Sequence, residues 1–282
     1  MKKNIIKLTK IFFLLLLIVS FILVPFTLFY NKSYNSNVKT SIPKNLKVAF
    51  IGDQGLSNYS KAVLKMIKEE KTDVVLHQGD FDYEDNPEKW HKQINKILGP
   101  RFPYFGSIGN HDADKWPDYQ KKLKSRLNRI KGIDCKGDLG VKSVCSYKGL
   151  FFLLLGPGIE GKNYETYIKE QLSANNFTWR ICSWHKNQRL MQVGGKLDEV
   201  GWQAYEECRK NGAIIATAHE HSYSRTYLMN NFENQTIASK SGVLHIRKNK
   251  TFAFVSALGG KSIRRQNDTL AENPWWASVY LM

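Results

Sequence analysis

Five short segments of the sequence place metal-binding side chains at the end of an apolar run. They are Gly52-Asp53, Gly79-Asp80-Phe81-Asp82-Tyr83, Gly109-Asn110-His111-Asp112, Trp184-His185 and His219-Glu220-His221. Carboxylate, imidazole and amide groups suit hard divalent and trivalent cations better than thiolates do. Two cations held roughly 3.5 to 4 Å apart can clamp a phosphoryl group and convert a bound water into a nucleophile. The set is therefore typical of a two-metal hydrolase of phosphate esters.

The elements that must position these residues are expected to alternate between strands and helices. The expected strands are residues 46–51, 73–77, 104–108, 150–155, 180–184, 213–218, 243–247 and 252–257. The expected helices are residues 60–70, 87–98, 118–131, 164–174 and 199–210. This order predicts an α/β domain with a mainly parallel sheet. The metal-binding residues then lie beyond the carboxyl ends of strands, where open α/β sheets bind their ligands.

Asp80 and the histidines at 219 and 221 have the clearest positions within the set. Asp80 follows the apolar stretch Val74-Val75-Leu76, so it is the natural carboxylate to bridge two cations. His219 and His221 are expected to alternate in an extended segment, which turns both side chains to one side and Glu220 away. The histidines without such companions, which we interpret as structural, are His77, His91 and His245.

The order of the five segments resembles that of the calcineurin-like metallophosphoesterase superfamily, over nearly all of residues 46–260. Residues 79–83 match the GDxxY block of purple acid phosphatases, residues 109–112 resemble their GNH block, and residues 218–225 resemble their GHxHxYxR block. The resemblance implies the superfamily's fold of layered β-sheets flanked by helices, in the small single-domain form. Two departures are Ala218 in place of the usual glycine and residues 184–187, which match the histidine block only in part.

The resemblance also implies a ligand set and its metals. Asp53, Asp80, Tyr83 and His221 would hold the first ion, and Asp80, Asn110, His185 and His219 the second. Iron as Fe(III) is implied for the first site, with Zn(II), Mn(II) or Fe(II) in the second. A phenolate suits Fe(III), a hard and strongly charged ion. The alternative for Tyr83 is an aromatic side chain that packs beside the site.

The expected reaction is hydrolysis of phosphate monoesters by a metal-bound hydroxide, acting on a small-molecule or phosphoprotein substrate. His111 is expected to donate a proton to the leaving group or to stabilise the transition state, and the alternative is that it orients another group. Asp112 could fix the His111 tautomer or cap the following turn. Arg225, Tyr223 and Lys196 are candidate substrate contacts at the pocket edge. The alternatives are a phosphodiesterase or nucleotide pyrophosphatase with the same metals and a non-catalytic surface-binding protein. No recognised nucleic-acid-binding motif is present, so no nucleic-acid partner is expected.

The N-terminus predicts a membrane anchor. Residues 1–10 carry four lysines, and residues 11–30 form an uncharged apolar run that is long enough to span a bilayer. Lysines before such a run stay in the cytoplasm, so the catalytic domain, residues 46–282, is expected on the outer side of a single-pass protein. Residues 31–45 read as a polar linker. Secretion after cleavage of a signal peptide is the alternative.

Charge and cysteine content are compatible with that placement. The chain has 42 Lys and Arg against 25 Asp and Glu, a formal charge of +17, which could attract anionic substrates or an anionic membrane. Its four cysteines allow three pairings, of which Cys135 with Cys145 is favoured, and four reduced thiols are the alternative. The sequons expected of an exported glycoprotein begin at Asn31, Asn58, Asn176, Asn234, Asn249 and Asn267.

Overall fold

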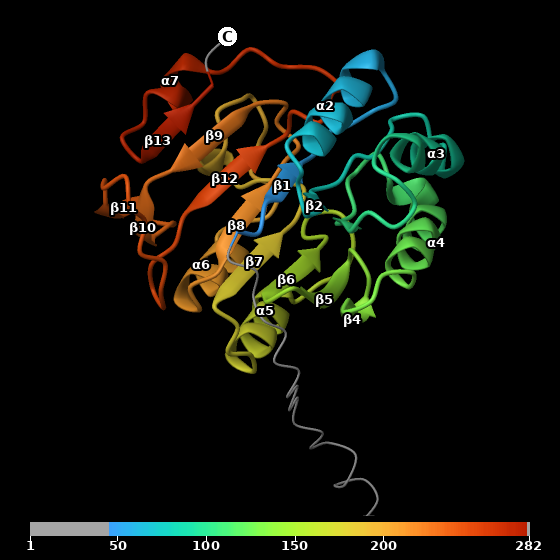
Figure 1. Ribbon diagram of the computed structural model, residues 1–282. Coiled ribbons are helices and arrows are strands. Elements are labelled where there is room, and N and C mark those ends of the chain that lie inside the picture. The colour runs from blue at the N-terminus through green and yellow to red at the C-terminus, as the bar shows by residue number, and fades with distance from the viewer. Residues whose placement is uncertain (1–44, 281–282) are drawn as a thin grey trace, which may run out of the picture. The chain divides into compact units, whose positions relative to one another are not determined.

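Two β-sheets pack against each other in the computed structural model, which describes residues 45–280, and helices cover them on both sides (Figure 1). The smaller sheet has three parallel strands, which are β1 (Val48–Ile51), β2 (Val74–His77) and β3 (Tyr104–Gly106). The helices that connect or follow them are α2 (Asn58–Glu69), α3 (Pro87–Ile97) and α4 (Trp116–Leu127). A short 3-10 helix, η1 (Ala113–Lys115), precedes α4.

The larger sheet has eight strands in the order β13-β9-β12-β8-β7-β6-β5-β4. In chain order they are β4 (Asp134–Asp138), β5 (Lys142–Tyr147), β6 (Leu150–Leu155), β7 (Trp179–Ser183), β8 (Ile214–Thr217), β9 (Tyr223–Thr226), β12 (Ala253–Ser256) and β13 (Trp276–Val279). The central strands β6, β7, β8 and β12 are parallel, whereas the outer pairs are antiparallel. Strand β12 therefore lies between β8 and β9, although it follows both in sequence.

The remaining elements lie around this sheet. They are α5 (Tyr164–Ser173), η2 (Arg189–Met191), α6 (Gln203–Lys210), α7 (Asp268–Ala271) and a separate antiparallel pair, β10 (Leu228–Asn231) with β11 (Thr236–Ser239). None of the helices within residues 45–280 combines the length and the apolar character needed to cross a membrane. The predicted anchor at 11–30 and its flanks at 1–10 and 31–44 lie outside the described residues.

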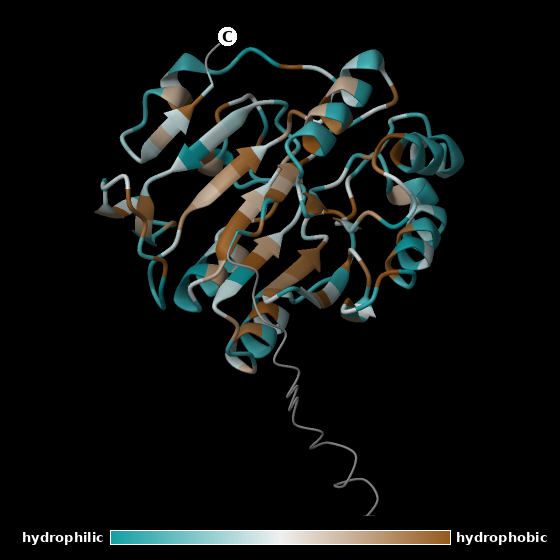
Figure 2. Ribbon diagram, in the orientation of Figure 1, coloured by the Kyte–Doolittle hydropathy of each residue, from teal (hydrophilic) through white to brown (hydrophobic). Residues whose placement is uncertain are grey.

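Burial on two faces explains the continuous apolar run of β6, which is hydrophobic throughout in Figure 2. Leu150, Phe152 and Leu154 point into the core between the two sheets. Phe151, Leu153 and Leu155 point the other way and pack in the core that includes α5 and α6. Burying a Leu or Phe side chain stabilises the fold by roughly 1.5 to 3 kcal/mol, so both faces of this strand contribute strongly.

Capping side chains mark the first turns of α2 and α3, the two helices that follow β1 and β2. The Ser57 hydroxyl accepts hydrogen bonds from the backbone amides of Tyr59 (3.1 Å) and Ser60 (3.3 Å), which caps α2. Asn86 caps α3 through the Lys89 amide at 3.0 Å, and Pro87 occupies the first turn, where its missing N–H has no consequence.

Most predicted elements are confirmed to within a few residues, but one is wrong. Residues 243–247 form no strand: only Arg247 makes an isolated bridge, to Lys250, across a turn in which Asn249 has a φ of 67°. Val243 is exposed, so the apolar residues there do not enter the core. Helix α6 begins at Gln203 rather than at residue 199. The elements without a predicted counterpart are β4, β5, β9, β10, β11, β13, α7 and the 3-10 helices η1 and η2.

Both plausible disulfides are present. Cys135 on β4 and Cys145 on β5 are register partners, and they form the favoured pair. The second bond joins Cys182 on β7 to Cys208 on α6 and ties the strand that leads to His185 to the helix packed on it. The smaller sheet is wholly parallel as expected, whereas the larger one is mixed, because its outer strands return as hairpins.

Candidate metal centre

All of the predicted metal ligands come from loops at the carboxyl ends of strands. Asp53 follows β1, Asp80 and Tyr83 follow β2, Asn110 follows β3, His185 follows β7, and His219 and His221 follow β8. The first three loops belong to the smaller sheet and the last two to the larger one. The structure therefore brings the seven predicted ligands together where the two sheets end side by side.

Unusual backbone conformations direct several of these side chains. Asp53, Asp80, Tyr83 and His219 have φ values of 57°, 60°, 60° and 67°, in the left-handed region that L-residues other than glycine rarely adopt. Each such residue costs on the order of 1 to 3 kcal/mol, and this strain is typical of functional sites. Gly109 allows a close approach of two loops, because a Cβ atom there would lie 2.1 Å from the Asp80 amide nitrogen.

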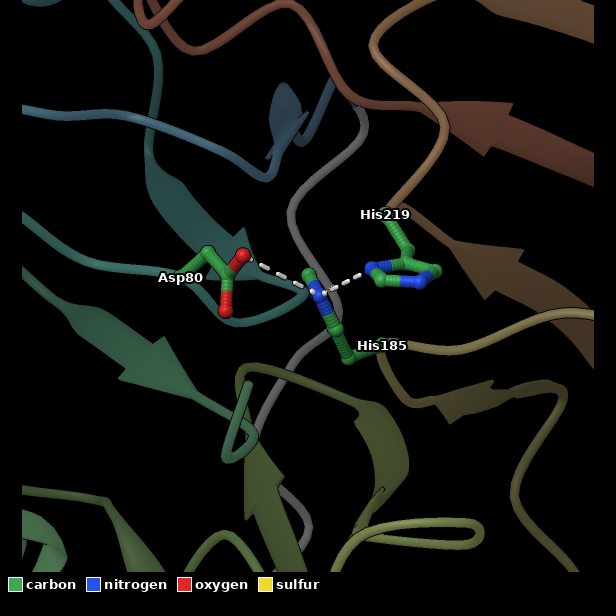
Figure 3. A group of neighbouring side chains, drawn as sticks. All are labelled: Asp80, His185 and His219. Carbon is green, nitrogen blue, oxygen red and sulfur yellow. Dashed lines mark hydrogen bonds and ion pairs between the residues drawn. The ribbon is translucent and has the colours of Figure 1, made fainter. Parts of the chain in front are cut away.

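Four residues form what we call the second half-site: Asp80, Asn110, His185 and His219. His185 Nε2 lies 3.3 Å from Asp80 Oδ2, 3.1 Å from Asn110 Oδ1 and 3.0 Å from His219 Nδ1. Figure 3 shows the His185 ring between Asp80 and His219. His185 Nδ1 lies 2.7 Å from the Gln78 carbonyl oxygen, which fixes the proton on Nδ1. Burial acts to lower the pKa of His185, but the charge of Asp80 and its hydrogen bond raise it to about 9, so a cation that binds Nε2 would replace the proton there.

Three residues form the first half-site: Asp53, Tyr83 and His221. The Tyr83 hydroxyl lies 2.6 Å from Asp53 Oδ1 and 3.0 Å from His221 Nε2, and that nitrogen is also 3.0 Å from Asp53 Oδ1. The other Asp53 oxygen accepts a hydrogen bond from the His219 amide at 2.9 Å, which connects the two half-sites.

Electrostatics between these groups indicate a site shaped for positive charge. Burial raises the pKa of Tyr83 far above its usual value, and the carboxylates of Asp53 and Asp80 raise it further. Burial acts against ionisation of Asp80, but the charge of His185, the hydrogen bond from its ring and the hydrogen bond from the His111 amide together outweigh burial and hold the pKa of Asp80 well below its usual range. Burial, with His185 as the next cause, lowers the pKa of His219 to about 2, so this imidazole is neutral. Buried carboxylates beside a neutral imidazole and a phenol fit the donor set of hard cations.

Asp112 is a clamp between two loops. Its buried carboxylate accepts hydrogen bonds from the backbone amides of Asp80 (2.7 Å), Phe81 (2.8 Å) and Gly109 (2.8 Å). Burial and the nearby charge of Asp80 raise the pKa of Asp112 to about 8. In the described part of the chain these bonds hold the turn before His111 rather than the His111 imidazole, so the geometry favours a positioning role.

His111 lies at the open side of the first half-site. Its backbone amide donates to Asp80 Oδ1 at 2.9 Å, and its exposed ring lies 4.6 Å from the Tyr83 ring, measured between centroids. The hydrogen bond to Asp80, a predicted metal ligand, thus fixes the main chain of His111. The imidazole is left exposed to solvent, where a substrate could reach it.

The loop that carries His219 and His221 differs from the extended segment that we predicted. Residues 219–222 form a bend, since His219 has a left-handed φ, yet both imidazoles still reach the centre. Glu220 is buried and lies 3.7 Å from the Arg264 guanidinium. Among the histidines interpreted as structural, His77 is buried beneath the site, where its Nδ1 lies 2.8 Å from the Tyr104 hydroxyl.

Two of the predicted substrate contacts lie on a strand that leads away from the centre. Tyr223 and Arg225 belong to β9, where they pair with Ser256 and Phe254 of β12. At 3.3 Å per residue, β9 carries Arg225 roughly 7 Å beyond Tyr223. Lys196 is closer, because its charge contributes to lowering the pKa of His219.

Several residues around the centre were missed by the sequence reasoning. Glu199 Oε2 lies 2.9 Å from His219 Nε2, and its other oxygen lies 2.7 Å from Lys186 Nζ. The segment 259–264 contacts the first half-site through Lys261 and Ser262. Only the Gly259-Gly260 pair after a predicted strand marks this segment in the sequence, and a glycine pair signals a turn rather than a ligand.

Comparison with known proteins agrees with this geometry. Residues 46–223 match the calcineurin-like phosphoesterase family. No curated protein gives a significant match over any part of the chain. The fold is similar to that of the purple acid phosphatase PPD1 from yellow lupin (Lupinus luteus) seeds, with a TM-score of 0.59 and 18% identity over 83% of this chain. It is also similar to that of PhoD, with a TM-score of 0.52 and 13% identity over 83% of this chain.

These two relatives are longer proteins, since the chain covers 47% of the lupin enzyme and 61% of PhoD. At such identities the likeness concerns the fold alone. The family match spans more than half of the chain and contains all seven ligand-type residues that converge at the strand ends. The chain therefore belongs to the calcineurin-like phosphoesterase family.

Proposed function

We propose that the protein is a phosphomonoesterase with two metal ions, Fe(III) in the first half-site and Zn(II), Mn(II) or Fe(II) in the second. The observation that carries the proposal is the position of Asp80. Its carboxylate contacts His185 of the second half-site at 3.3 Å. The same carboxylate also contributes to raising the pKa of the Tyr83 hydroxyl in the first half-site. A pair of neighbouring cations requires a carboxylate that can bind both, and Asp80 lies between the two half-sites.

The types of donor atom in each half-site indicate which ion it would hold. Asp53, Asp80, Tyr83 and His221 would hold Fe(III), because a phenolate and two carboxylates supply negative charge to a trivalent ion. Asp80, Asn110, His185 and His219 would hold the divalent ion through one carboxylate, an amide oxygen and two imidazoles. When bound, such a pair polarises the phosphoryl group and lowers the pKa of a water molecule.

The protein's own groups handle orientation and protons. Asp112 holds the two loops that carry Asp80 and Asn110, so the ligands do not have to reorganise when substrate binds. The exposed His111 imidazole, next to Tyr83, is placed to give a proton to the leaving alcohol. The Gln78 carbonyl keeps a proton on His185 Nδ1, so Nε2 is the nitrogen whose proton a cation would replace.

The test is hydrolysis of p-nitrophenyl phosphate and bis(p-nitrophenyl) phosphate by purified protein loaded with iron and zinc. We expect turnover of the monoester and its loss in the Asp80→Asn variant, while Asp114→Asn, which changes an exposed residue of η1, keeps it. Metal analysis should give two ions per chain in the wild type and fewer in Asp80→Asn. Turnover of the diester alone would favour a phosphodiesterase, and a folded, loaded protein without turnover of either ester would favour a binding role.

We propose further that the catalytic domain faces the outside of a membrane. Support comes from the lysine-rich residues 1–10, the apolar run 11–30 and the two disulfides, since disulfides persist in oxidising compartments. Alkaline carbonate extraction should leave the full-length protein in the membrane pellet, and protease added to intact cells should remove the domain. Release by carbonate would indicate secretion after cleavage instead.

A further inference from the structure

A segment late in the sequence, residues 259–264, packs against the first half-site. Residues 259–264 follow β12, and they pass over the loop after β1. The Gly259 amide donates to the Gly52 carbonyl at 2.8 Å, and the Lys261 amide donates to the Asp53 carbonyl at 3.0 Å. A Cβ atom at Gly259 would lie 2.4 Å from the Gly52 oxygen, so only glycine permits this approach.

The same segment holds the histidine of the first half-site. The Ser262 hydroxyl lies 2.5 Å from His221 Nδ1, and the Arg264 amide donates to the His221 carbonyl at 2.9 Å. Residues 259–264 therefore contact both Asp53 and His221, although at least 38 residues separate them from either ligand in the sequence. This fixes where the segment's side chains lie relative to the centre.

Lys261 is the cationic side chain that this arrangement brings to the first half-site. Its ammonium group lies 4.5 Å from the centroid of the Tyr83 ring, whose hydroxyl faces Asp53 and His221. His111, the expected proton donor, packs on the same ring at 4.6 Å. In the described part of the chain no carboxylate forms an ion pair with Lys261, and its side chain is exposed. The charge is thus available to a ligand that enters beside Tyr83.

We propose that Lys261 is a specificity-determining residue that binds a charged oxygen of the phosphoryl group and favours monoesters over diesters. The inference rests on the proposed function, because it concerns the substrate of the same centre. A phosphate monoester carries up to two negative charges near neutral pH, whereas a diester carries one, and the extra charged oxygen is the group that a further cation recognises. Free inorganic phosphate offers the same oxygens, so it serves as a probe that does not depend on turnover.

The experiment compares Lys261→Met, which keeps the length of the side chain but removes its charge, with Lys261→Arg and with Lys65→Met, an exposed lysine on α2. A hydrogen bond to a charged group contributes on the order of a tenfold change in binding. We therefore expect Lys261→Met to lower the ratio of kcat/KM for p-nitrophenyl phosphate to that for bis(p-nitrophenyl) phosphate about tenfold. The dissociation constant for inorganic phosphate, measured by calorimetry on metal-loaded protein, should rise on the same scale, whereas Lys261→Arg and Lys65→Met stay close to the wild type.

Three results separate the possible readings. The proposal is supported if Lys261→Met keeps the wild-type metal content while its ratio of monoester to diester kcat/KM falls. Equal losses on both esters, or unchanged phosphate binding, would overturn the proposal, because they assign Lys261 a structural role or none. If the wild type hydrolyses no monoester, the proposed function fails, and the phosphate calorimetry on wild type and Lys261→Met still decides whether this lysine binds the anion.

Discussion

At the scale of single residues, Tyr83 is the side chain on which the proposal of Fe(III) in the first half-site depends. Its hydroxyl lies within hydrogen-bond distance of both Asp53 and His221, a geometry that favours the proposed role as a ligand over packing beside the site. Burial and two carboxylates make the phenolate unfavourable without a cation. Only a strongly charged ion in the first half-site reverses that balance.

The Tyr83→Phe variant tests this assignment. Protein loaded with iron in air should show a visible absorption band from phenolate-to-iron charge transfer, and the variant should lose it because no phenolate remains. Absorption spectra of the two proteins at matched iron content provide the measurement. Tyr59→Phe, which alters an exposed tyrosine on α2, is the control and should keep the band. A band that persists in Tyr83→Phe would show that Tyr83 is not a ligand.

His111 makes a second prediction at this scale. If it protonates the leaving group, its replacement matters most when the leaving oxygen is strongly basic. We expect His111→Gln to lower kcat on an alkyl phosphate by roughly 100-fold or more and to affect p-nitrophenyl phosphate, whose leaving group needs little protonation, far less. Steady-state kinetics on both esters measure the difference. Equal losses would assign the residue to orientation instead.

At the scale of elements, the clamp formed by Asp112 joins the loops after β2 and β3. An asparagine has nearly the same shape but one acceptor oxygen, so at least one buried amide among Asp80, Phe81 and Gly109 would lose its partner. Such a loss costs about 1 to 3 kcal/mol. We expect Asp112→Asn to lower the free energy of unfolding by this amount and to weaken metal binding by roughly 10- to 100-fold. Denaturant unfolding and metal titration measure the two effects, and Asp138→Asn, on an exposed edge strand, is the control.

The elements that the sequence predicted well are those with one dominant local cause. The strands β1, β2 and β6 are short apolar runs that end in turn residues, and α2 and α3 begin at capping side chains. The positions of the ligand-type residues could then be predicted as well, because a residue that follows a parallel strand lies at the carboxyl edge of the sheet.

The elements that were missed depend on partners far away in the chain. Strand β9, with the sequence Tyr-Ser-Arg-Thr, has no apolar run of its own and is held by pairing with β12 and β13. The residues around the centre show the same pattern. Glu199, Lys261 and Ser262 reach their partners through tertiary packing, and nothing in their spacing indicates those contacts.

At the scale of the whole molecule, buried histidines set a limit on acid stability. Burial, the main cause, lowers the pKa of His77 from 6.5 to about 3. Below pH 6.5 the unfolded chain binds a proton at this residue that the folded protein does not, so the free energy of unfolding falls as the pH falls toward 3. From pH 7.5 to 5.5 this residue costs about 1.4 kcal/mol.

Denaturant unfolding of the metal-free protein at the two pH values measures this effect. The His77→Gln variant should show a smaller loss between pH 7.5 and 5.5 than the wild type, whatever its stability at pH 7.5. His245→Gln, which alters an exposed histidine, should keep the wild-type difference. An unchanged pH dependence in His77→Gln would mean that other groups cause it.

The position of β12 between β8 and β9 has a consequence for the timing of activity during synthesis. The loop with His219 and His221 leaves the sheet at β8 and returns at β9. Within residues 45–280, β9 pairs only with β12 and β13, which the ribosome makes later. A nascent chain that already contains every metal ligand therefore lacks the strand that anchors this loop and the segment 259–264 that seats His221. The centre is complete only when nearly the whole domain has been translated, so we expect an unfinished chain to lack the proposed hydrolytic activity.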